Sequence, residues 1–253
     1  MTWLRFGGAS VDHKARVAVK VWGDMACFSR PEFKVERVSY PVMTPSAARG
    51  ILEAIFWRPE FRYQIRAIGV LKPGKTISIL RNELAERQGN APIFIEDQRQ
   101  QRASLVLRDV AYLIHADMVL RPHATDPIYK YVDQFRRRVE RGQYHHAPYL
   151  GTREFPAFFS PDNGETPPDL NLDVGPMLFD IAFIPSSQRP EMEFHRHGPG
   201  GACRVTGYAQ PLFFDARVEH GWLHVPPQKY DDLYRMEGDD AAGTGQGSRP
   251  FSG

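Results

Sequence analysis

The stretch TPSAARGILEAIFWRPEFRYQIR, residues 44–66, decides the fold. Thr44 and Pro45 form a strong helix start, because the threonine side chain can accept a backbone N–H of the first turn and proline has no N–H to lose. Apolar residues then recur at helical spacing as far as Phe56, and Pro59 prevents continuation, so we expect a helix over residues 45–57. From residue 61 apolar and polar side chains alternate, which predicts a strand directly after the helix.

The same alternation appears before the helix, over residues 16–22, and predicts a first strand. Strand, helix and strand thus make a β-α-β unit in which the second strand directly follows the helix. Residues 72–104 are mostly polar, and we expect them to form a protruding hairpin with short strands near residues 76–80 and 92–96. Residues 104–107 and 110–120 are apolar and return the chain to the sheet.

A second helix is predicted to begin after Asp126 and Pro127, by the same capping argument as the first. Its buried stripe comprises Ile128, Val132, Phe135 and Val139. Its other faces carry Lys130 and four arginines, and Gly142 is placed to end the helix.

The order of these elements, with a further strand expected at residues 177–184, predicts an α+β protein with a ferredoxin-like N-terminal domain, the order that RNA-recognition domains share. After residue 160 many Pro and Gly residues separate short strands near 211–218 and 222–225, which predicts a small C-terminal antiparallel β-sheet region. We therefore expect a domain over residues 16–160, a β region over 161–235, and a disordered tail over 236–253, which has almost nothing to bury.

Composition excludes several classes of protein. The chain of 253 residues is 42% hydrophobic, with no stretch near the roughly 20 apolar residues of a membrane span. Its two cysteines lie far apart, so a disulfide framework is not indicated and a reducing compartment fits. We expect a cytoplasmic protein. Nucleotide-binding loops, HExxH motifs and GxSxG elbows are missing from the sequence, and we predict no cofactor.

The arginines are unevenly distributed although the formal net charge is only +2. One run lies between residues 99 and 108 and another between 136 and 141, and two such runs favour an anionic partner over ordinary solvated helix faces. In the second helix Tyr129 and Tyr131 flank Lys130, and aromatic groups beside cations suit single-stranded RNA. An amphipathic helix with tyrosines at the core edge fits that spacing equally well.

Histidines cluster at His145–His146 and at His195 and His197, with Cys203 beyond. Their spacing matches no standard metal site, and glycines near the second group favour a loop there. We predict no metal site and expect these histidines to face the surface or a substrate.

Several stretches resemble the type I-C Cas-five proteins of the CRISPR-associated RAMP superfamily. They are VWGDMACFSRPEFKVERVSYPVMTPSAARGILEAIFWRP (residues 21–59), KYVDQFRRRVERGQ (130–143), LGTREFPA (150–157) and LFFDA (212–216). The resemblance covers most of the chain in the family's order. It implies an RNA-recognition-like domain, metal-independent cleavage of precursor CRISPR RNA within the repeat, and retention of the 5′ handle beside the backbone and large subunits of a surveillance complex.

The resemblance also implies three catalytic positions: a tyrosine at the end of the first helix and a Lys-His pair at the start of the second. In this sequence these positions are Phe56, Lys130 and Tyr131. The lysine is kept, but Phe56 has no hydroxyl, and Tyr131 could act as a base only with a pKa lowered by its cationic neighbours. Other possible bases, which the sequence does not rank, are Tyr40, His115, His123, His145 and His146.

RNA contacts are expected from residues in and around the two basic runs: Arg37, Tyr40, Arg49, Arg99, Arg102, Arg136, Arg137, Arg138, Arg141, His145 and His146. Two other functions remain open at this point. The chain could be a handle-binding subunit that does not cleave, if nothing replaces the altered catalytic residues. It could also be a ferredoxin-like small-molecule enzyme or regulatory module without RNA affinity.

Overall fold

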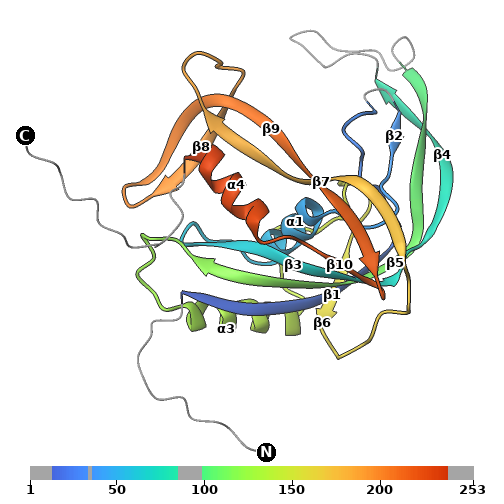
Figure 1. The fold of residues 1–253 in the computed structure, drawn as a ribbon, viewed down its shortest axis with the longest axis horizontal. Coiled ribbons are helices and arrows are strands. Elements are labelled where there is room, and N and C mark those ends of the chain that lie inside the picture. The colour runs from blue at the N-terminus through green and yellow to red at the C-terminus, as the bar shows by residue number, and fades with distance from the viewer. Residues whose placement is uncertain (1–12, 34–35, 85–98, 239–253) are drawn as a thin grey trace, which may run out of the picture.

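The computed structural model describes residues 13–33, 36–84 and 99–238 of the chain. These residues form long strands and three helices, arranged as Figure 1 shows. In chain order the elements are β1 (Lys14–Ala26), β2 (Arg37–Val38), α1 (Pro45–Ile55), β3 (Phe61–Lys72), β4 (Lys75–Leu84), β5 (Arg99–Leu120), α3 (Ile128–Glu140), β6 (Phe158–Pro161), β7 (Leu172–Pro185), β8 (Met192–Gly198), β9 (Gly201–Glu219), β10 (Trp222–His224) and α4 (Gln228–Glu237).

The strands form one sheet whose main path runs β6-β1-β5-β3-β10-β9-β7. Of the pairings in the described chain, only β2 with β5 is parallel. The predicted α+β class, with a mostly antiparallel sheet and helices, is confirmed. The strand expected at residues 177–184 lies within β7, at the far end of the path from β1. The strand that pairs with β1 on the side away from β5 is instead β6. Its four residues are too few to show an alternating pattern in the sequence.

Helices α1 and α3 pack on the same face of the sheet, against the alternating side chains of β3. Tyr63 donates a hydrogen bond from its hydroxyl to the Phe56 carbonyl at 2.8 Å, and its ring lies 6.0 Å from that of Phe135 in α3. The apolar stripes predicted for both helices are buried. Thr44 caps α1 as predicted, since its Oγ1 accepts the Ala47 N–H at 3.3 Å.

The predicted hairpin is present, and it is longer than expected. Strand β4 pairs with the first half of β5 from Lys75↔Arg108 to Leu84↔Arg99, and the two strands rise from the sheet at the right of Figure 1. The short strand predicted at residues 92–96 lies outside the described residues. The two strands predicted at 104–107 and 110–120 form one continuous strand, in which Asp109 adopts a φ of 58°.

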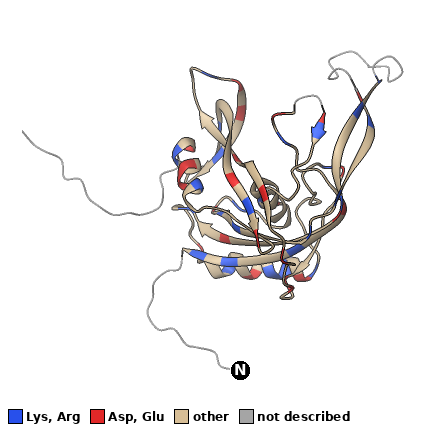
Figure 2. Cartoon of the chain, turned by 45° about the vertical axis from the view of Figure 1, so that its right-hand side comes forward, with Lys and Arg blue, Asp and Glu red and all other residues tan. Residues whose placement is uncertain are grey.

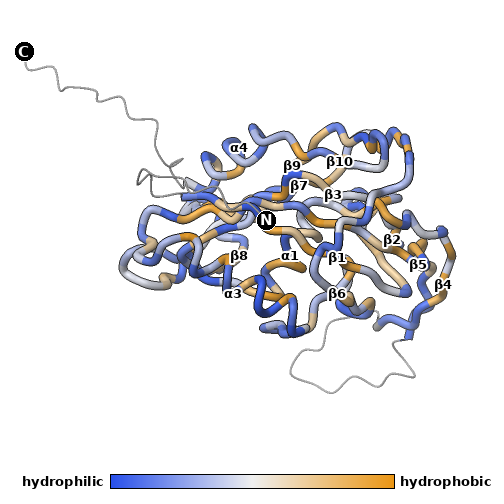
Figure 3. Tube along the Cα trace, turned by 90° about the horizontal axis from the view of Figure 1, so that it is seen from below, coloured by the Kyte–Doolittle hydropathy of each residue, from blue (hydrophilic) through white to orange (hydrophobic). Residues whose placement is uncertain are grey.

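Helix α4 was not predicted from sequence. It lies at the part of the β3 edge that β10 leaves unpaired: the Tyr230 hydroxyl accepts the Ile65 N–H at 2.5 Å, and the Val225 N–H donates to the Arg66 carbonyl at 3.0 Å. Much of α4 is hydrophilic, as Figure 3 shows, which leaves a weak periodic signal. The helix includes the first two residues of the predicted tail, so the tail can begin no earlier than Gly238; residues 239–253 lie outside the described chain.

The segment containing His195 and His197 is a strand and not the predicted glycine-rich loop. It forms β8 and pairs with β9 through His195↔Arg204 and His197↔Ala202. The pairing of β10 with β3 continues the sheet across residue 160, where the two-domain division was expected. That division stays a prediction.

Candidate catalytic and nucleic-acid site

The three positions expected to be catalytic come together at one end of the sheet, where α1 and β5 end and β3 and α3 begin. The Phe61 ring, in β3, lies 5.4 Å from the Phe56 ring and 5.4 Å from the Tyr131 ring. Residues 56 and 131 are thus joined through one buried aromatic contact, although 75 positions separate them in the sequence.

Lys130 lies on the outward face of α3, as predicted, with its side chain 55% exposed. Its Nζ donates to Asp126 Oδ1 at 2.6 Å, and this hydrogen bond, with the charge of the carboxylate, raises the pKa of the lysine. Lys130 is therefore a cation at neutral pH. Asp126 does not cap α3 as expected: the N-cap is Pro127, which makes no side-chain hydrogen bond, and the aspartate side chain contacts Lys130 instead.

Tyr131 is buried, and its surroundings act on its pKa in the opposite sense from the one a base would need. Burial raises the pKa of the hydroxyl, the charges of Glu60 and Asp126 raise it further, and Lys130 and Arg58 only partly oppose them. The lowered pKa that a basic Tyr131 requires is not found. At neutral pH this side chain can donate a proton or a hydrogen bond but cannot abstract a proton.

Phe56 and Arg138 contact each other where α1 ends. Phe56 is fully buried, and the Arg138 guanidinium lies 5.3 Å from the centre of its ring. Arg138 Nη1 also donates to the Ile55 carbonyl at 2.7 Å, one of the carbonyls that the end of α1 leaves without a helical partner. Arg138 thus holds α3 against the end of α1, a structural role that was not expected from sequence.

His145 and His146 lie beside the same helix end. Both backbone N–H groups donate to the Ala54 carbonyl, at 2.7 Å and 3.3 Å, and both side chains are exposed. Arg138 and these two histidines therefore converge on the last turn of α1. The imidazoles remain available to RNA on this surface.

Among the other possible bases, His123 precedes Lys130 and Tyr131 most closely in the chain. It lies in the connection from β5 to α3, and its Nε2 is 3.1 Å from the Pro59 carbonyl. A carbonyl can only accept, so in this hydrogen bond Nε2 carries the proton and Nδ1 holds the lone pair. The side chain of His115 points to the sheet face opposite the helices, since its neighbours Ile114 and Ala116 are buried under them.

Besides Arg138, two residues expected to contact RNA have structural roles instead. Tyr40 is fully buried, its hydroxyl accepts the Leu178 N–H at 3.2 Å, and burial raises its pKa. Arg49 makes hydrogen bonds to Asp180 and Glu53. The sequence pattern hid both roles, because the partners at 178 and 180 lie about 130 residues away.

The remaining arginines of α3 are exposed. Arg136, Arg137 and Arg141 lie on the outer face of the helix, and Figure 2 shows basic residues along it. A shallow surface depression runs along this face; it is lined by Asp126, Lys130, Tyr131, Asp133, Gln134, Arg136, Arg137 and Glu140. Asp126 and Asp133 outnumber Lys130 in the first part of this lining, whereas Arg136 and Arg137 outnumber Glu140 in the last part. The positive charge is therefore concentrated toward the C-terminal turns of α3.

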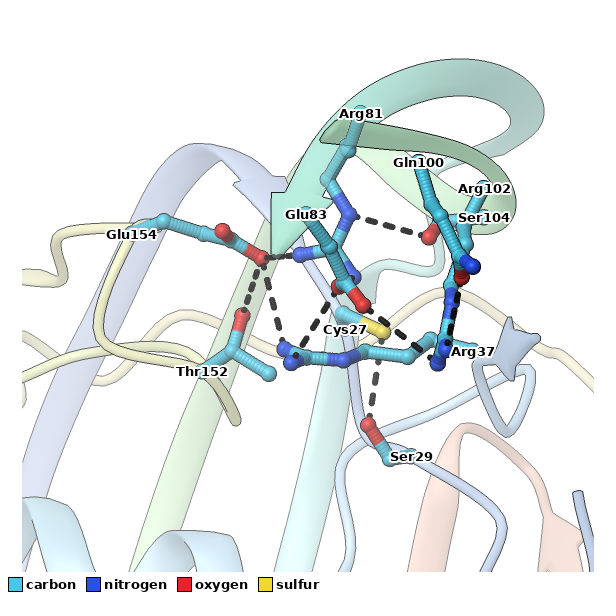
Figure 4. A network of polar contacts seen from close by, with 10 residues as sticks. All are labelled: Cys27, Ser29, Arg37, Arg81, Glu83, Gln100, Arg102, Ser104, Thr152 and Glu154. Carbon is cyan, nitrogen blue, oxygen red and sulfur yellow. Dashed lines mark hydrogen bonds and ion pairs between the residues drawn. The ribbon is translucent and has the colours of Figure 1, made fainter. Parts of the chain in front are cut away.

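The arginines in the outer half of the β4–β5 hairpin, around the Arg81↔Arg102 pair, form an ion-pair network with neighbouring carboxylates, which Figure 4 shows. Arg81 contacts Glu154 and Glu83, Arg37 contacts the same two carboxylates at 3.8 Å and 3.5 Å, and Arg102 lies 3.6 Å from Glu83. Three guanidinium groups share two carboxylates, so the network keeps a positive excess. Arg99 is exposed at the start of β5, further along the hairpin.

A cleft that the sequence did not reveal lies between α1, the start of β3, strands β7 and β8, and α4. Its volume is about 330 Å³. Its lining includes Trp57, which directly follows Phe56, and both histidines of β8. Elements from both halves of the chain build this cleft, and no local motif could have indicated it.

Known proteins resemble this chain over nearly its whole length. A family model described as CRISPR-associated protein (Cas_Cas5), of the Cas5d type, matches residues 17–174. A protein of Thermus thermophilus named CRISPR pre-crRNA endoribonuclease Cas5d is 66% identical over 230 residues, which is 90% of this chain and 99% of that protein. The chain belongs to the Cas5d family.

A second Cas5d relative, from Mannheimia succiniciproducens and with the same name, is 40% identical over 244 residues and covers 87% of this chain and 99% of that protein. Two solved structures share the fold at 20% identity: a CRISPR-associated protein, with a TM-score of 0.57 over 85% of this chain and 94% of that one, and a functionally uncharacterized protein from Streptococcus mutans, with a TM-score of 0.56 over 85% and 95%.

Two observations limit what this Cas5d-family chain holds in its described part. No group of three or more His, Cys, Asp or Glu side chains in residues 13–33, 36–84 and 99–238 is arranged to hold a metal ion. Within the same residues, no helix has both the length and the apolar character that crossing a membrane requires.

Proposed function

We propose that this protein cuts precursor CRISPR RNA within the repeat, without a metal ion, and keeps the 5′ handle of the product as a subunit of a type I-C surveillance complex. The observation that carries the proposal is the meeting of residues 56, 130 and 131 at one end of the sheet, in a chain 66% identical to a pre-crRNA endoribonuclease. The basic residues of α3 give RNA a surface that begins beside these positions, and those of the hairpin lie at the opposite end of β5.

The proposed reaction needs three groups. The ribose 2′-oxygen attacks the adjacent phosphorus, a base takes the 2′-hydroxyl proton, and the P–O5′ bond breaks as an acid protonates the leaving oxygen; the products are a 2′,3′-cyclic phosphate and a 5′-hydroxyl. Lys130 is an exposed cation that can stabilise the negative charge of the transition state. Tyr131 holds its proton at neutral pH and suits the donor role.

His123 is the base that the geometry favours. Its Nε2 is fixed by the Pro59 carbonyl, and the opposite nitrogen, Nδ1, keeps a lone pair that can accept a proton. It also belongs to the segment that leads directly into Lys130 and Tyr131. His145 and His146 lie beside Arg138, which is two helical turns, about 12 Å, beyond Lys130 along α3. That spacing suits the holding of RNA better than proton transfer at the same phosphate.

The finer fold assignment is part of this proposal. We infer that β1, α1, β3, β5, α3 and β6 form the ferredoxin-like unit, with β6 as its last strand. Support comes from the adjacency β6-β1-β5-β3 and from the packing of both helices on one face. The other predicted part, the C-terminal β region, then comprises β7 to β10 with α4.

A non-cleaving, handle-binding subunit is the second candidate. It is favoured by one observation: Phe56 offers no hydroxyl at the position where the family resemblance implies a catalytic tyrosine. Incubation of the purified protein with end-labelled repeat RNA in EDTA separates the candidates. A single cut that leaves a cyclic phosphate supports the enzyme, and tight binding without a cut supports the non-cleaving subunit. If the protein has no affinity for the RNA, both candidates are refuted and the small-molecule alternative is favoured.

A further inference from the structure

The cleft beside Trp57 combines an aromatic surface with a concentration of arginines. Trp57 follows the end of α1 and is 41% exposed, although it lines the cleft. The His197 ring of β8 meets the Trp57 ring edge-on at 5.2 Å between centroids. The two rings come from different walls of the cleft and are inclined by 69°, so they form an aromatic corner in which an unpaired base can stack on one ring and meet the edge of the other.

The charge of the lining is positive. It contains four arginines (Arg49, Arg62, Arg121 and Arg196) and three acidic residues (Glu53, Asp180 and Glu237), a formal excess of one positive charge before either histidine is protonated. Arg49 forms ion pairs with both Glu53 and Asp180. Arg62 is oriented by Tyr234, whose ring centre is 3.5 Å from the guanidinium carbon.

The size of the cleft limits its occupant. A volume of about 330 Å³ is at the lower end of the roughly 300–1,000 Å³ range of ligand sites, which suits one nucleotide and excludes a base pair. Its entrance residue, Trp57, is the next residue after Phe56, so the cleft opens beside the end of the sheet where the reacting phosphate is proposed to lie.

We propose that this cleft binds a single unpaired nucleotide of the repeat RNA close to the cut, with its base against Trp57 and His197 and its phosphate toward the arginines. The inference rests on the proposed function and adds where one nucleotide of the substrate is held. It explains why β8 and α4, far from α3 in sequence, reach over the end of α1.

The test is a scan of the repeat RNA in which each unpaired nucleotide in turn is replaced by an abasic one. For the wild-type protein we expect one position near the cut to lose affinity by about 5- to 150-fold, because stacking one base on an aromatic side chain is worth about 1–3 kcal/mol. Trp57→Ala and His197→Ala should lose affinity for the intact RNA and become insensitive to the abasic change at that position. Phe213→Ala is the control, since Phe213 is 39% exposed on β9 and lies outside the cleft lining.

The outcomes separate the two proposals. If the wild type binds and cuts intact repeat RNA but no abasic position matters, the cleft inference is wrong and the proposed function stands. The same holds if Trp57→Ala and His197→Ala lower affinity but the abasic loss persists in both, since the base then rests elsewhere. If the wild type neither binds nor cuts repeat RNA, the proposed function itself fails and the cleft inference fails with it.

Discussion

Arg49 holds Asp180 through two parallel hydrogen bonds: Nε donates to Oδ2 at 2.8 Å, and Nη2 donates to Oδ1 at 2.7 Å. The pair joins α1 to β7, and so links the part of the chain that carries Phe56 to the C-terminal strands. The Asp180 side chain is only 4% exposed, whereas Arg49 keeps more contact with solvent. Paired guanidinium and carboxylate groups of this geometry fix orientation as well as contributing energy.

Removing the carboxylate is expected to lower stability strongly. Asp180→Ala leaves a partly buried guanidinium with Glu53 alone, and we expect a loss toward the lower end of about 3–5 kcal/mol. For a chain of this length that corresponds to a fall in Tm of roughly 6–12 °C. Thermal unfolding followed by circular dichroism measures it. Glu191→Ala is the matched control, because the Arg189–Glu191 pair is about half exposed and its loss should change Tm far less.

The pH dependence of cleavage should show whether Tyr131 acts as a base or as a proton donor. Because burial raises the pKa of Tyr131, its hydroxyl keeps its proton through neutral pH and loses it only above the usual pKa near 10. A tyrosine base would make the single-turnover rate climb into strongly alkaline solution. With Tyr131 as the proton donor, the rate should instead fall in strongly alkaline solution, where its hydroxyl has lost the proton that it must donate.

His123→Ala should reduce the rate by about 10²- to 10⁴-fold, the usual scale of general base assistance. Tyr131→Phe should reduce the rate and remove the alkaline decline. The control is His115→Ala, which alters a histidine on the opposite face of the sheet. A parental rate in His123→Ala would assign the base to another residue.

The arginines of α3 should divide into two kinds. Arg136, Arg137 and Arg141 are exposed, and replacing all three by Ala should reduce the slope of log affinity against log salt by about 2, at about 0.7 for each phosphate contact in single-stranded nucleic acid. Binding measured by fluorescence anisotropy at several salt concentrations gives the slope. Arg217→Ala, an exposed arginine of β9, should leave it unchanged.

Arg138→Ala should behave differently from its neighbours. It removes the hydrogen bond to the Ile55 carbonyl and the contact with the Phe56 ring, so the main effect should be a lower Tm and not a change in salt slope. A full loss of one phosphate contact in the slope, with an unchanged Tm, would contradict the structural role assigned here.

Local patterns were sufficient for the first half of the fold. The Thr44–Pro45 start, the buried stripe of α1 and the alternation from Phe61 each depend on neighbours within a few residues, and all appear as predicted. The outward position of Lys130 follows from the same helical period. Element ends were less accurate, because β1 and β5 continue through polar residues that pairing with other strands stabilises.

The sequence could not predict features that depend on long-range pairing. The contact side of helix α4 is defined by the edge of β3, where the Tyr230 hydroxyl accepts the N–H of Ile65. These two residues are 165 positions apart in the sequence. Arg49 and Tyr40 looked like surface residues because their partners lie on β7, more than 130 positions away. The raised pKa of Tyr131 likewise depends on burial against Phe61, and the positive charges nearby in sequence suggested the opposite.

Lys130 is expected to matter for cleavage more than for binding, because its charge acts where negative charge develops on the phosphate. Lys130→Ala should melt as the parent does and bind repeat RNA within several-fold, while its single-turnover rate under saturating protein falls by about two orders of magnitude, the scale of losing one transition-state contact. Lys72→Ala is a close control: Lys72 is 59% exposed and lies 3.1 Å from Asp109, much as Lys130 lies 2.6 Å from Asp126. A mutant that cleaves at the parental rate once saturated would reduce Lys130 to a phosphate contact, since a lost binding group weakens affinity and leaves the rate of the bound complex alone.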